Sequence, residues 1–270
     1  MFANFSFADD SRLKITNTDT PPTIDGVLSP DEWKSAAKTE LGFQKEPQEN
    51  DQPTERTEVF LMFDKENLYV AFHAFDSTPS AIRAPISKRD SVGSDDFVSI
   101  WLDTYDDRRR TYAFRFNPLG IQEDGIFTQA DVGNLSWDGI LESKGNLTGD
   151  GYIVEAKIPF KTLRYQINKE KTWGLHLFRW IARKAERSTW AKTSLANSDL
   201  LSQMGTLQGI DDIFSGRTLD IIPTLTLSNN GERELHNDVP TLNTVNRLDA
   251  GVTVNYSITP NLTLAATVNP

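Results

Sequence analysis

The amino-acid sequence predicts an all-β protein whose main part is a β-sandwich. Apolar and polar residues alternate in several segments of residues 95–181, and polar turn sequences separate these segments. Two earlier segments, EVFLMFD and LYVAFHAFD, are apolar on both faces, as expected for strands in the middle of a two-layer core. We therefore expect an immunoglobulin-like architecture of two packed sheets, with one or two short helices.

The N-terminal part of the chain contains a pattern typical of an export signal and, further on, a pattern typical of the start of a helix. Residues 1–19 are expected to be disordered or the remnant of an export signal, since Ser6-Phe7-Ala8 resembles the small-x-small end of a signal peptide. Further on, Ser29-Pro30-Asp31-Glu32 combines an N-cap, a proline at the first helical position and a capping-box glutamate. This pattern predicts a short helix up to about Ala37, with Trp33 on its buried side.

The alternating segments predict which side chains share a sheet face, because successive residues of a strand point to opposite sides. In residues 97–102 and 112–117 the alternate residues of each strand form two sets, one for each face. One of the two sets is apolar in both segments: Val98, Ile100, Leu102, Tyr112, Phe114 and Phe116. The opposite set of the second segment contains Arg115 and Asn117. A guanidinium and an amide two residues apart are suited to binding hydroxyls or a carboxylate.

From about Arg217 the pattern changes to strands with one polar and one thin apolar face. Residues 219–227 and 251–270 are the clearest examples. Strand pairs of this kind are typical of the start of a membrane β-barrel, and ordinary surface hairpins have the same pattern. We therefore expect a β-sandwich domain over residues 20–222 and the start of a C-terminal β-barrel or a β-hairpin tail over 223–270. Since the alternation of apolar and polar residues continues up to Pro270, we expect the chain to belong to a longer protein.

Composition excludes several classes of function. The formal charge of −10 and the pI near 4.9 argue against a nucleic-acid partner, which would require a basic surface. The absence of cysteine removes disulfides, thiol catalysis and zinc-thiolate sites. No phosphate-binding glycine loop, nucleophile elbow or HExxH motif is present, so we do not expect an enzyme.

Seven segments carry a resemblance to a known family, and they occur in this order: TIDGVLSPDEW, FDKENLYVAFHAFD, DDFVSIWLDTYDDRR, FRFNPLGIQEDG, GYIVEAKIPFKTLRY, WGLHLFR and MGTLQGI. The chain resembles the carbohydrate-binding module family 9-like domain that precedes certain bacterial outer-membrane β-barrel proteins of unknown function. The resemblance covers about residues 20–222. It implies a β-sandwich, a place in the bacterial cell envelope associated with the outer membrane, and affinity for carbohydrate.

The resemblance also implies sugar contacts. Arg115 and Asn117 match an Arg-x-Asn pair that contacts sugar in xylan-binding members of the family. Two tryptophans that sandwich the sugar in those members fall near residues 92–94 and near Asp199-Leu200, where this chain has no tryptophan. A carboxylate of the family falls at Ser99.

Three further residues are candidate ligand contacts. Trp137 and Trp190 lie at the ends of strands and could stack on a sugar ring, and each could instead be a core anchor. Glu155 offers a carboxylate on the polar side of its strand. Glu155 with Asp96 would be the pair of carboxylates for glycoside hydrolysis, but neither lies in a catalytic signature.

Four carboxylates at predicted strand ends are candidate calcium ligands: Asp95, Asp96, Asp103 and Asp124. Calcium requires six to eight oxygens, often from converging loops. No segment has the spacing of an EF-hand loop, and solvated turn acids are the alternative. We expect no other cofactor.

The sequence therefore predicts a non-catalytic domain that binds a saccharide or a related envelope ligand, in carbohydrate catabolism, with the attached membrane barrel as its partner. The alternative is an interaction or plug module for the barrel or a partner protein, with no sugar binding. A third class is a haem-binding sandwich domain, for which the Met and His candidates for axial ligands are Met62, His73, His176 and Met204.

Overall fold

The computed structural model describes residues 11–129, 135–165, 172–210, 213, 218–236, 239–259 and 262–269. The chain divides into two units, Met1–Phe214 and Ser215–Pro270. The described residues form strands and four single-turn 3₁₀ helices, which are η1 (Pro79–Ala81), η2 (Phe160–Thr162), η3 (Ala182–Lys184) and η4 (Leu201–Gln203). None of the helices in this part of the chain is long or apolar enough to cross a bilayer.

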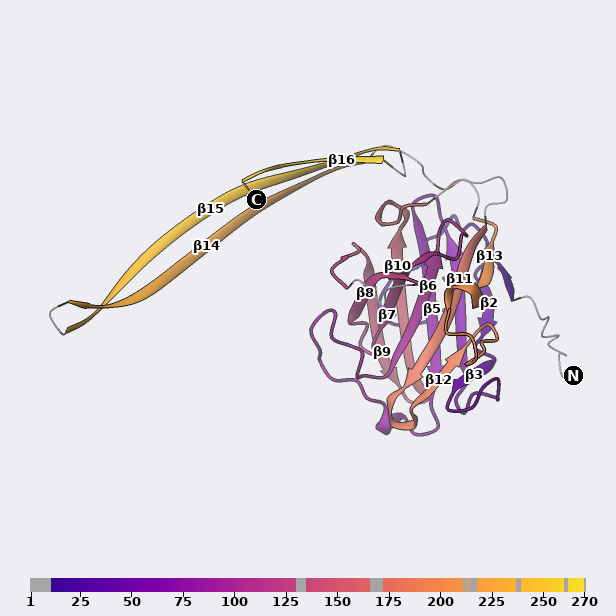
Figure 1. The fold of residues 1–270 in the computed structure, drawn as a ribbon. Coiled ribbons are helices and arrows are strands. Elements are labelled where there is room, and N and C mark those ends of the chain that lie inside the picture. The colour runs from indigo at the N-terminus through magenta and orange to yellow at the C-terminus, as the bar shows by residue number, and fades with distance from the viewer. Residues whose placement is uncertain are drawn as a thin grey trace, which may run out of the picture. The chain divides into compact units, whose positions relative to one another are not determined.

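The first unit is a β-sandwich of two sheets (Figure 1), which confirms the predicted fold class. The first sheet has the order β1 (Arg12–Lys14), β13 (Gly205–Gln208), β11 (Thr172–Ile181), β6 (Phe97–Asp103), β7 (Arg110–Phe116) and β8 (Gln122–Thr128). In addition, β12 (Glu186–Thr189) pairs with β11 and with β3 (Phe43–Glu46). The second sheet has the order β2 (Ala37–Glu40), β4 (Thr57–Phe63), β5 (Asn67–Phe75), β10 (Gly151–Pro159) and β9 (Glu142–Thr148).

The main core lies between the two sheets and follows the predicted alternation. On β6 and β7 it takes the apolar set that contains Ile100 and Phe114, and on β11 it takes Leu175 and Leu177. The second sheet contributes Val70 and other alternate residues of β4, β5 and β10. Because alternate residues point away from this core, Phe97, Trp101, Arg115 and Phe178 lie on the outer face of the first sheet.

Two local predictions are corrected. Residues 30–36 form turns instead of a helix, although Trp33 is buried as expected. The segment covers the outer face of the second sheet, where Trp33 packs beside Met62 and Tyr69, and this packing overrides the capping signal. Within residues 1–19, where disorder was expected, β1 pairs in parallel with β13 and Ile15 lies in the core. Residues 1–10 lie outside the described part of the chain.

A buried ion pair joins the two sheets. Arg179 of β11 and Asp76, which follows β5, both have fully buried side chains and lie 3.3 Å apart. The Nη1 of Arg179 donates to the carbonyl oxygen of Phe75 at 2.7 Å and to Thr57 Oγ1 at 3.2 Å. Arg183 binds the other oxygen of Asp76 at 2.7 Å. These contacts fix one end of β11 against β4 and β5.

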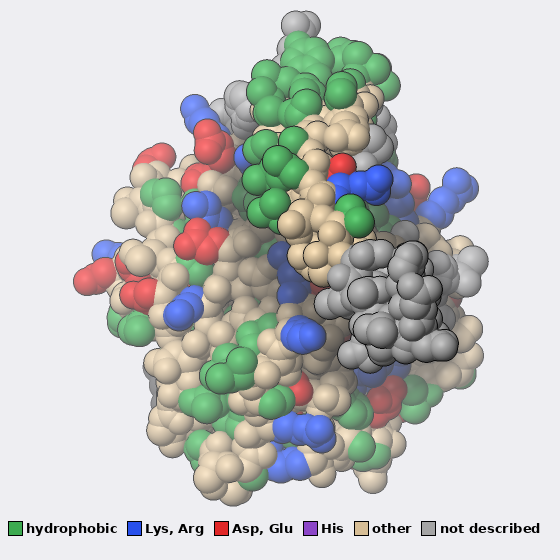
Figure 2. All heavy atoms as spheres, turned by 90° about the vertical axis from the view of Figure 1, so that its left-hand side faces the viewer, with side chains coloured by type: hydrophobic (Ala, Val, Ile, Leu, Met, Phe, Trp, Pro, Cys, Tyr) green, Lys and Arg blue, Asp and Glu red, His purple; other side chains and the backbone are tan. Residues whose placement is uncertain are grey.

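The second unit is a sheet of three long strands: β14 (Thr218–His236), β15 (Val239–Thr259) and β16 (Leu262–Val268). The division between the units precedes residue 222, because β14 pairs with β15 and not with a sandwich strand. Register places mainly apolar residues on one face of this sheet: Leu219, Ile221, Pro223, Leu225, Leu227, Leu248, Ala250, Val252, Val254, Tyr256, Leu264, Ala266 and Val268. Most of these side chains are exposed, and in Figure 2 hydrophobic side chains gather along this sheet.

The ion pair gives the first testable prediction. Replacing Asp76 by Ala leaves the charge of Arg179 buried with one anion fewer, so we expect the free energy of unfolding of the first unit to fall by about 3–5 kcal/mol. Asp150→Ala is the control, because that side chain is 57% exposed, and we expect a loss under about 1 kcal/mol. Urea denaturation measures both. Equal losses in the two variants would contradict this role of the ion pair.

Candidate pocket on the outer face of the first sheet

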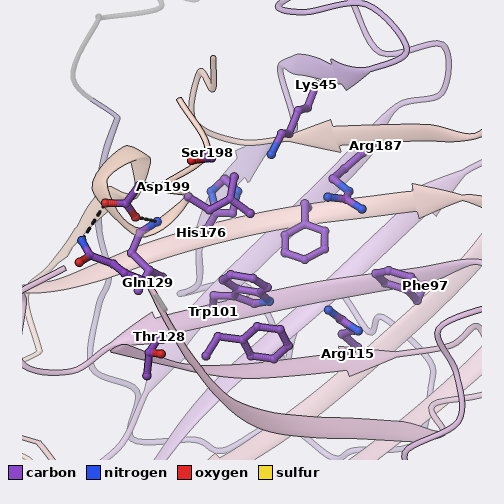
Figure 3. Close-up of a pocket in the computed structure, with 14 residues that line it drawn as sticks. Lys45, Phe97, Trp101, Arg115, Thr128, Gln129, His176, Arg187, Ser198 and Asp199 are labelled. Atoms are coloured by element: carbon purple, nitrogen blue, oxygen red, sulfur yellow. Dashed lines mark hydrogen bonds between the residues drawn. The ribbon is translucent and has the colours of Figure 1, made fainter. Parts of the chain in front are cut away.

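A pocket of about 290 Å³ opens on the outer face of the first sheet (Figure 3). This volume lies close to the lower end of the range of small-molecule pockets, which is about 300–1,000 Å³. The lining residues come from β3, β6, β7, β8, β11 and β12 and from the segment 198–201: Lys45, Phe97, Trp101, Arg115, Phe127, Thr128, Gln129, His176, Phe178, Arg187, Ser198, Asp199, Leu200 and Leu201. The pocket thus brings together residues that lie more than 150 positions apart in the sequence.

Aromatic rings form one wall of the pocket. The ring centroids of Trp101 and Phe127 lie 4.8 Å apart with an interplanar angle of 32°, and Phe178 meets Trp101 edge-on at 5.4 Å. Phe97 meets Phe178 edge-on at 6.1 Å. These side chains form a second apolar cluster, separate from the main core. An aromatic wall beside polar groups can bind a ring that has an apolar face and polar edges.

Three cationic side chains surround this wall. Arg115 of β7 lies between the rings of Phe97 and Phe127, 5.5 and 5.3 Å from their centroids, and pairs with Glu123. Arg187 of β12 lies 5.8 Å from the centroid of Phe178. Lys45 enters from β3. Figure 3 shows Arg187 and Arg115 facing each other across the pocket.

The opposite end of the pocket is polar and contains a carboxylate. Gln129 donates to Asp199 at 2.7 Å, and Asp199 also accepts from the backbone N–H groups of Leu201 and Ser202. Figure 3 places Ser198, Asp199, Gln129 and Thr128 at this end, away from Arg187 and Arg115. The pocket therefore has a cationic end and a hydroxyl, amide and carboxylate end.

His176 lies in the pocket wall as a neutral imidazole. Burial, together with the positive charges of Lys45 and Arg187, lowers its pKa from 6.5 to about 3. Burial lowers the pKa of Lys45 too, as does the charge of Arg187. The pKa of Arg187 is lowered by burial and by Arg115. The pKa shifts show that these cations act on one another and on His176.

Four buried polar atoms of the pocket have no hydrogen-bond partner among the described residues: Trp101 Nε1, Arg115 Nε, His176 Nδ1 and Arg187 Nε. Trp101 is 6% exposed and His176 is 2% exposed. A buried donor without a partner costs about 1–3 kcal/mol. These are four of the ten such atoms among the described residues, so unpaired polar atoms gather at this pocket and also occur elsewhere, as at Arg179 Nε.

Of the two residues that match the Arg-x-Asn pair, one lines the pocket. Arg115 does, whereas Asn117 is fully buried behind it. The Asn117 Oδ1 accepts from the N–H groups of Leu119 and Ile121, both at 3.0 Å, and its Nδ2 donates to Asp95 and to the carbonyl oxygen of Pro85, both at 3.2 Å. The amide of Asn117 holds the turn after β7 and has no donor left for a ligand.

Glu155 lies on the outer face of the other sheet and is fully buried. Its Oε1 accepts from Trp33 Nε1 at 2.8 Å, and its Oε2 accepts from the N–H groups of Gly26 and Asp25 at 2.8 and 3.1 Å. Burial raises the pKa of Glu155, and these hydrogen bonds oppose the rise. Glu155 holds the N-terminal segment against β10, and its strand belongs to the sheet opposite Asp96 of the predicted hydrolytic pair.

The two candidate tryptophans lie away from the pocket lining. Trp137 packs on Tyr112 and Phe114 at centroid distances of 5.0 and 5.9 Å, at the edge of the main core. Trp190 is 8% exposed and belongs to the main core. Both contact the core from the inner face of the first sheet, so neither adds a ring to the aromatic wall.

The candidate calcium ligands are distributed over separate places. Asp95 accepts from Ser87 and Asn117, Asp96 from the N–H of Ala182, and Asp103 from the N–H groups of its own turn. Among the described residues, Asp124 lies in the one group of three that could hold an ion, with Asp90 and Asp138. Arg89 already contacts all three carboxylates, at 2.6 Å for Asp124. The calcium site stays a prediction.

The haem candidates lie in several different environments. Met62 is buried beside Trp33 on the outer face of the second sheet, and His73 stacks on Phe75 of the same sheet. Met204 belongs to the aromatic cluster under the pocket, whose wall includes His176. The described structure does not pair any of these residues across one pocket.

The sandwich has counterparts among known proteins. The model of the carbohydrate family 9 binding domain-like family matches residues 24–199. The chain belongs to this family. The match includes the strands that build the aromatic wall and ends at Asp199 of the pocket. No curated protein matches the chain.

Solved structures of low sequence identity share the fold. Two are a carbohydrate-binding module family 9 from Caldicellulosiruptor kristjanssonii, in complex with cellotriose and with glucose. Both are 20% identical, with TM-scores of 0.53 and 0.54, covering 75% and 76% of this chain and 96% and 99% of theirs. A third is a proposed carbohydrate-binding protein from Bacteroides uniformis ATCC 8492, 13% identical with a TM-score of 0.58, covering 74% of this chain and 99% of its own.

Sequence reasoning missed most of the lining residues. Phe127, Phe178, Lys45 and Arg187 were not among the candidates, although Asp199-Leu200 was noted as the position of a family tryptophan. Alternation on β11 and β8 could have identified the two phenylalanines as outward-facing. No local signal brings Lys45 near Arg187, because that contact depends on the pairing of β3 with β12.

The neutral state of His176 gives a testable prediction. The pKa of His176 in the folded protein lies below the unfolded value of about 6.5. As the pH falls below 6.5, the imidazole therefore takes up a proton in the unfolded chain before it does so in the folded protein, and the free energy of unfolding decreases. Between pH 7 and pH 4 we expect His176 to account for about 1–3 kcal/mol of lost unfolding free energy. Urea denaturation of the wild type and of His176→Phe at both pH values measures it, and parallel pH dependence of the two would contradict this burial effect.

Proposed function

We propose that the sandwich is a non-catalytic domain that binds a saccharide in the pocket on the outer face of the first sheet. The observation that carries the proposal is the aromatic wall of Trp101, Phe127 and Phe178 with polar groups at both ends. A pyranose ring has apolar C–H faces that fit against such a wall and hydroxyl edges that reach the polar groups. Family membership and the saccharide complexes of similar folds support this proposal.

The lining supports binding without catalysis. Glycoside hydrolysis uses two carboxylates on either side of the scissile bond. Among the described residues that line the pocket, Asp199 is the sole carboxylate, and its oxygens accept from Gln129 and from backbone N–H groups. A carboxylate held in this way can fix a hydroxyl but has no partner on the other side.

We further propose that the second unit is part of a membrane β-barrel and that the protein belongs to the outer membrane of the bacterial cell envelope. The apolar face of β14 extends over residues 219–227, close to the about 9–11 residues that a membrane-spanning strand needs. Leu225 and Leu227 are 68% and 78% exposed, which suits contact with lipid. A saccharide-binding domain on an outer-membrane protein would serve the capture of carbohydrate for catabolism.

Removal of one ring from the wall tests the saccharide proposal. We expect Phe127→Leu to weaken binding of oligosaccharide by about fivefold, since a stacked aromatic contact is worth about 1 kcal/mol. Phe75→Leu is the matched control, because Phe75 lies on the second sheet, and we expect no change. Isothermal titration with cello-, xylo- and uronate-containing oligosaccharides measures both. If no saccharide binds the wild type at millimolar concentration, the domain is an interaction module instead.

A charge on the apolar face tests the membrane proposal. Leu225→Arg should reduce the amount of protein in the outer-membrane fraction of producing bacteria, since an arginine facing lipid costs about 2–4 kcal/mol near the middle of the bilayer. Thr224→Arg, on the opposite face of β14, is the control and should leave that amount unchanged. Equal distributions of the two variants would argue that the apolar face does not contact lipid.

A further inference from the structure

We infer that the saccharide residue bound in this pocket is acidic and that its carboxylate lies between Lys45, Arg115 and Arg187. The inference rests on the proposed function, because it assigns a chemical class to the same ligand. It derives from the type of the unpaired polar groups, from their charge and from their arrangement along the pocket. A hexuronate residue is a common sugar that combines a pyranose ring with one carboxylate.

The polar atoms at the cationic end are donors. Guanidinium, ammonium and indole N–H groups donate hydrogen bonds and accept none. Trp101 Nε1, Arg115 Nε and Arg187 Nε are buried and lack acceptors among the described residues. A sugar hydroxyl must itself donate a proton, whereas a carboxylate accepts only. The donors therefore match a carboxylate better than they match a hydroxyl.

The cationic end is also incompletely neutralised. Arg115 pairs with Glu123, but Arg187 is 3.8 Å from Glu46, and Lys45 has no ion pair within the described part of the chain. Lys45 is 7% exposed, so its ammonium is largely out of water. Because the charge of Arg187 is repelled by those of Lys45 and Arg115, an anion bound beside it would stabilise this group of cations. A protein with a net charge of −10 thus has a concave site of opposite sign.

The order of the groups along the pocket also agrees with the order of the groups on a uronate ring. Asp199, Gln129 and Ser198 lie at the end opposite Arg187 and Arg115, as Figure 3 shows. These groups can accept and donate hydrogen bonds with sugar hydroxyls. The aromatic wall of Trp101 and Phe127 lies between the two ends. A pyranose with a carboxylate on one edge and hydroxyls on the other reproduces this order.

The test compares three forms of one sugar at pH 7: methyl glucuronide, its uncharged methyl ester and methyl glucoside, with the galacto series measured in parallel by calorimetry. In at least one series we expect the uronate to bind roughly tenfold more tightly than its ester, which is the effect of one charge-assisted hydrogen bond. Two further probes are measured in the same way. Sulfated glucose tests whether the site prefers a sulfate, and phenylacetate tests whether it binds any carboxylate without a sugar ring.

Two lysine variants test the position of the carboxylate. Lys45→Met should remove the preference for the uronate while the affinity for the neutral glycoside stays within about twofold. Lys38→Met removes the same charge from β2 of the other sheet, where Lys38 pairs with Glu58, and should keep the preference. Trp101→Phe keeps a smaller aromatic ring and removes the N–H donor, and we expect it to reduce the preference as well.

The outcomes separate the two proposals. Equal binding of the uronate, the ester and the glucoside would overturn the acidic ligand and leave saccharide binding intact. Binding of phenylacetate with no binding of any sugar would overturn the saccharide proposal and retain an anion site. Preference for sulfated glucose over the uronate would overturn the carboxylate, and no binding of any probe would overturn both proposals.

Discussion

The alternation of side chains on the first sheet is the constraint on which the rest of the structure depends. Neighbouring residues such as Phe114 and Arg115, or Leu177 and Phe178, point to opposite faces, one into the main core and one into the pocket. A shift of one residue in the register would exchange the two sets. The packing that stabilises the sandwich therefore also fixes the aromatic wall, so the pocket is held by strands and not by loops.

Buried polar groups have two distinct roles in this sandwich. Arg179 and Glu155 make hydrogen bonds that attach segments to one another, across the sheets and onto the N-terminal segment respectively. The pocket has buried donors on Trp101 and Arg187 that bind no protein group among the described residues. Four of the ten unpaired buried polar atoms among the described residues lie at this one concave surface, beside the aromatic wall and the cations, and this combination is the physical reason for assigning a ligand to it.

The fold was largely predictable from sequence because alternation is a local property. The set Tyr112, Phe114 and Phe116 was assigned to the buried face, and the structure places it in the core. The pocket was only partly predictable, because the contact between Lys45 and Arg187 depends on strand pairing across more than a hundred residues. Asn117 shows a further limit, since its face was predicted but its amide is occupied by the turn that follows. At Ser29 the local capping signal yields to the packing of Trp33 on the second sheet.

We propose that the outer face of the first sheet binds an acidic sugar with its carboxylate at the cationic end. The most direct measurement is a crystal structure of the protein with methyl glucuronide, or with the galacto form if that one binds. We expect the sugar ring to lie against Trp101 and Phe127, and the carboxylate to lie within hydrogen-bond distance of Arg187 and Lys45. A sugar bound at the sandwich edge beside Trp137, or one with its carboxylate turned toward Asp199, would contradict it.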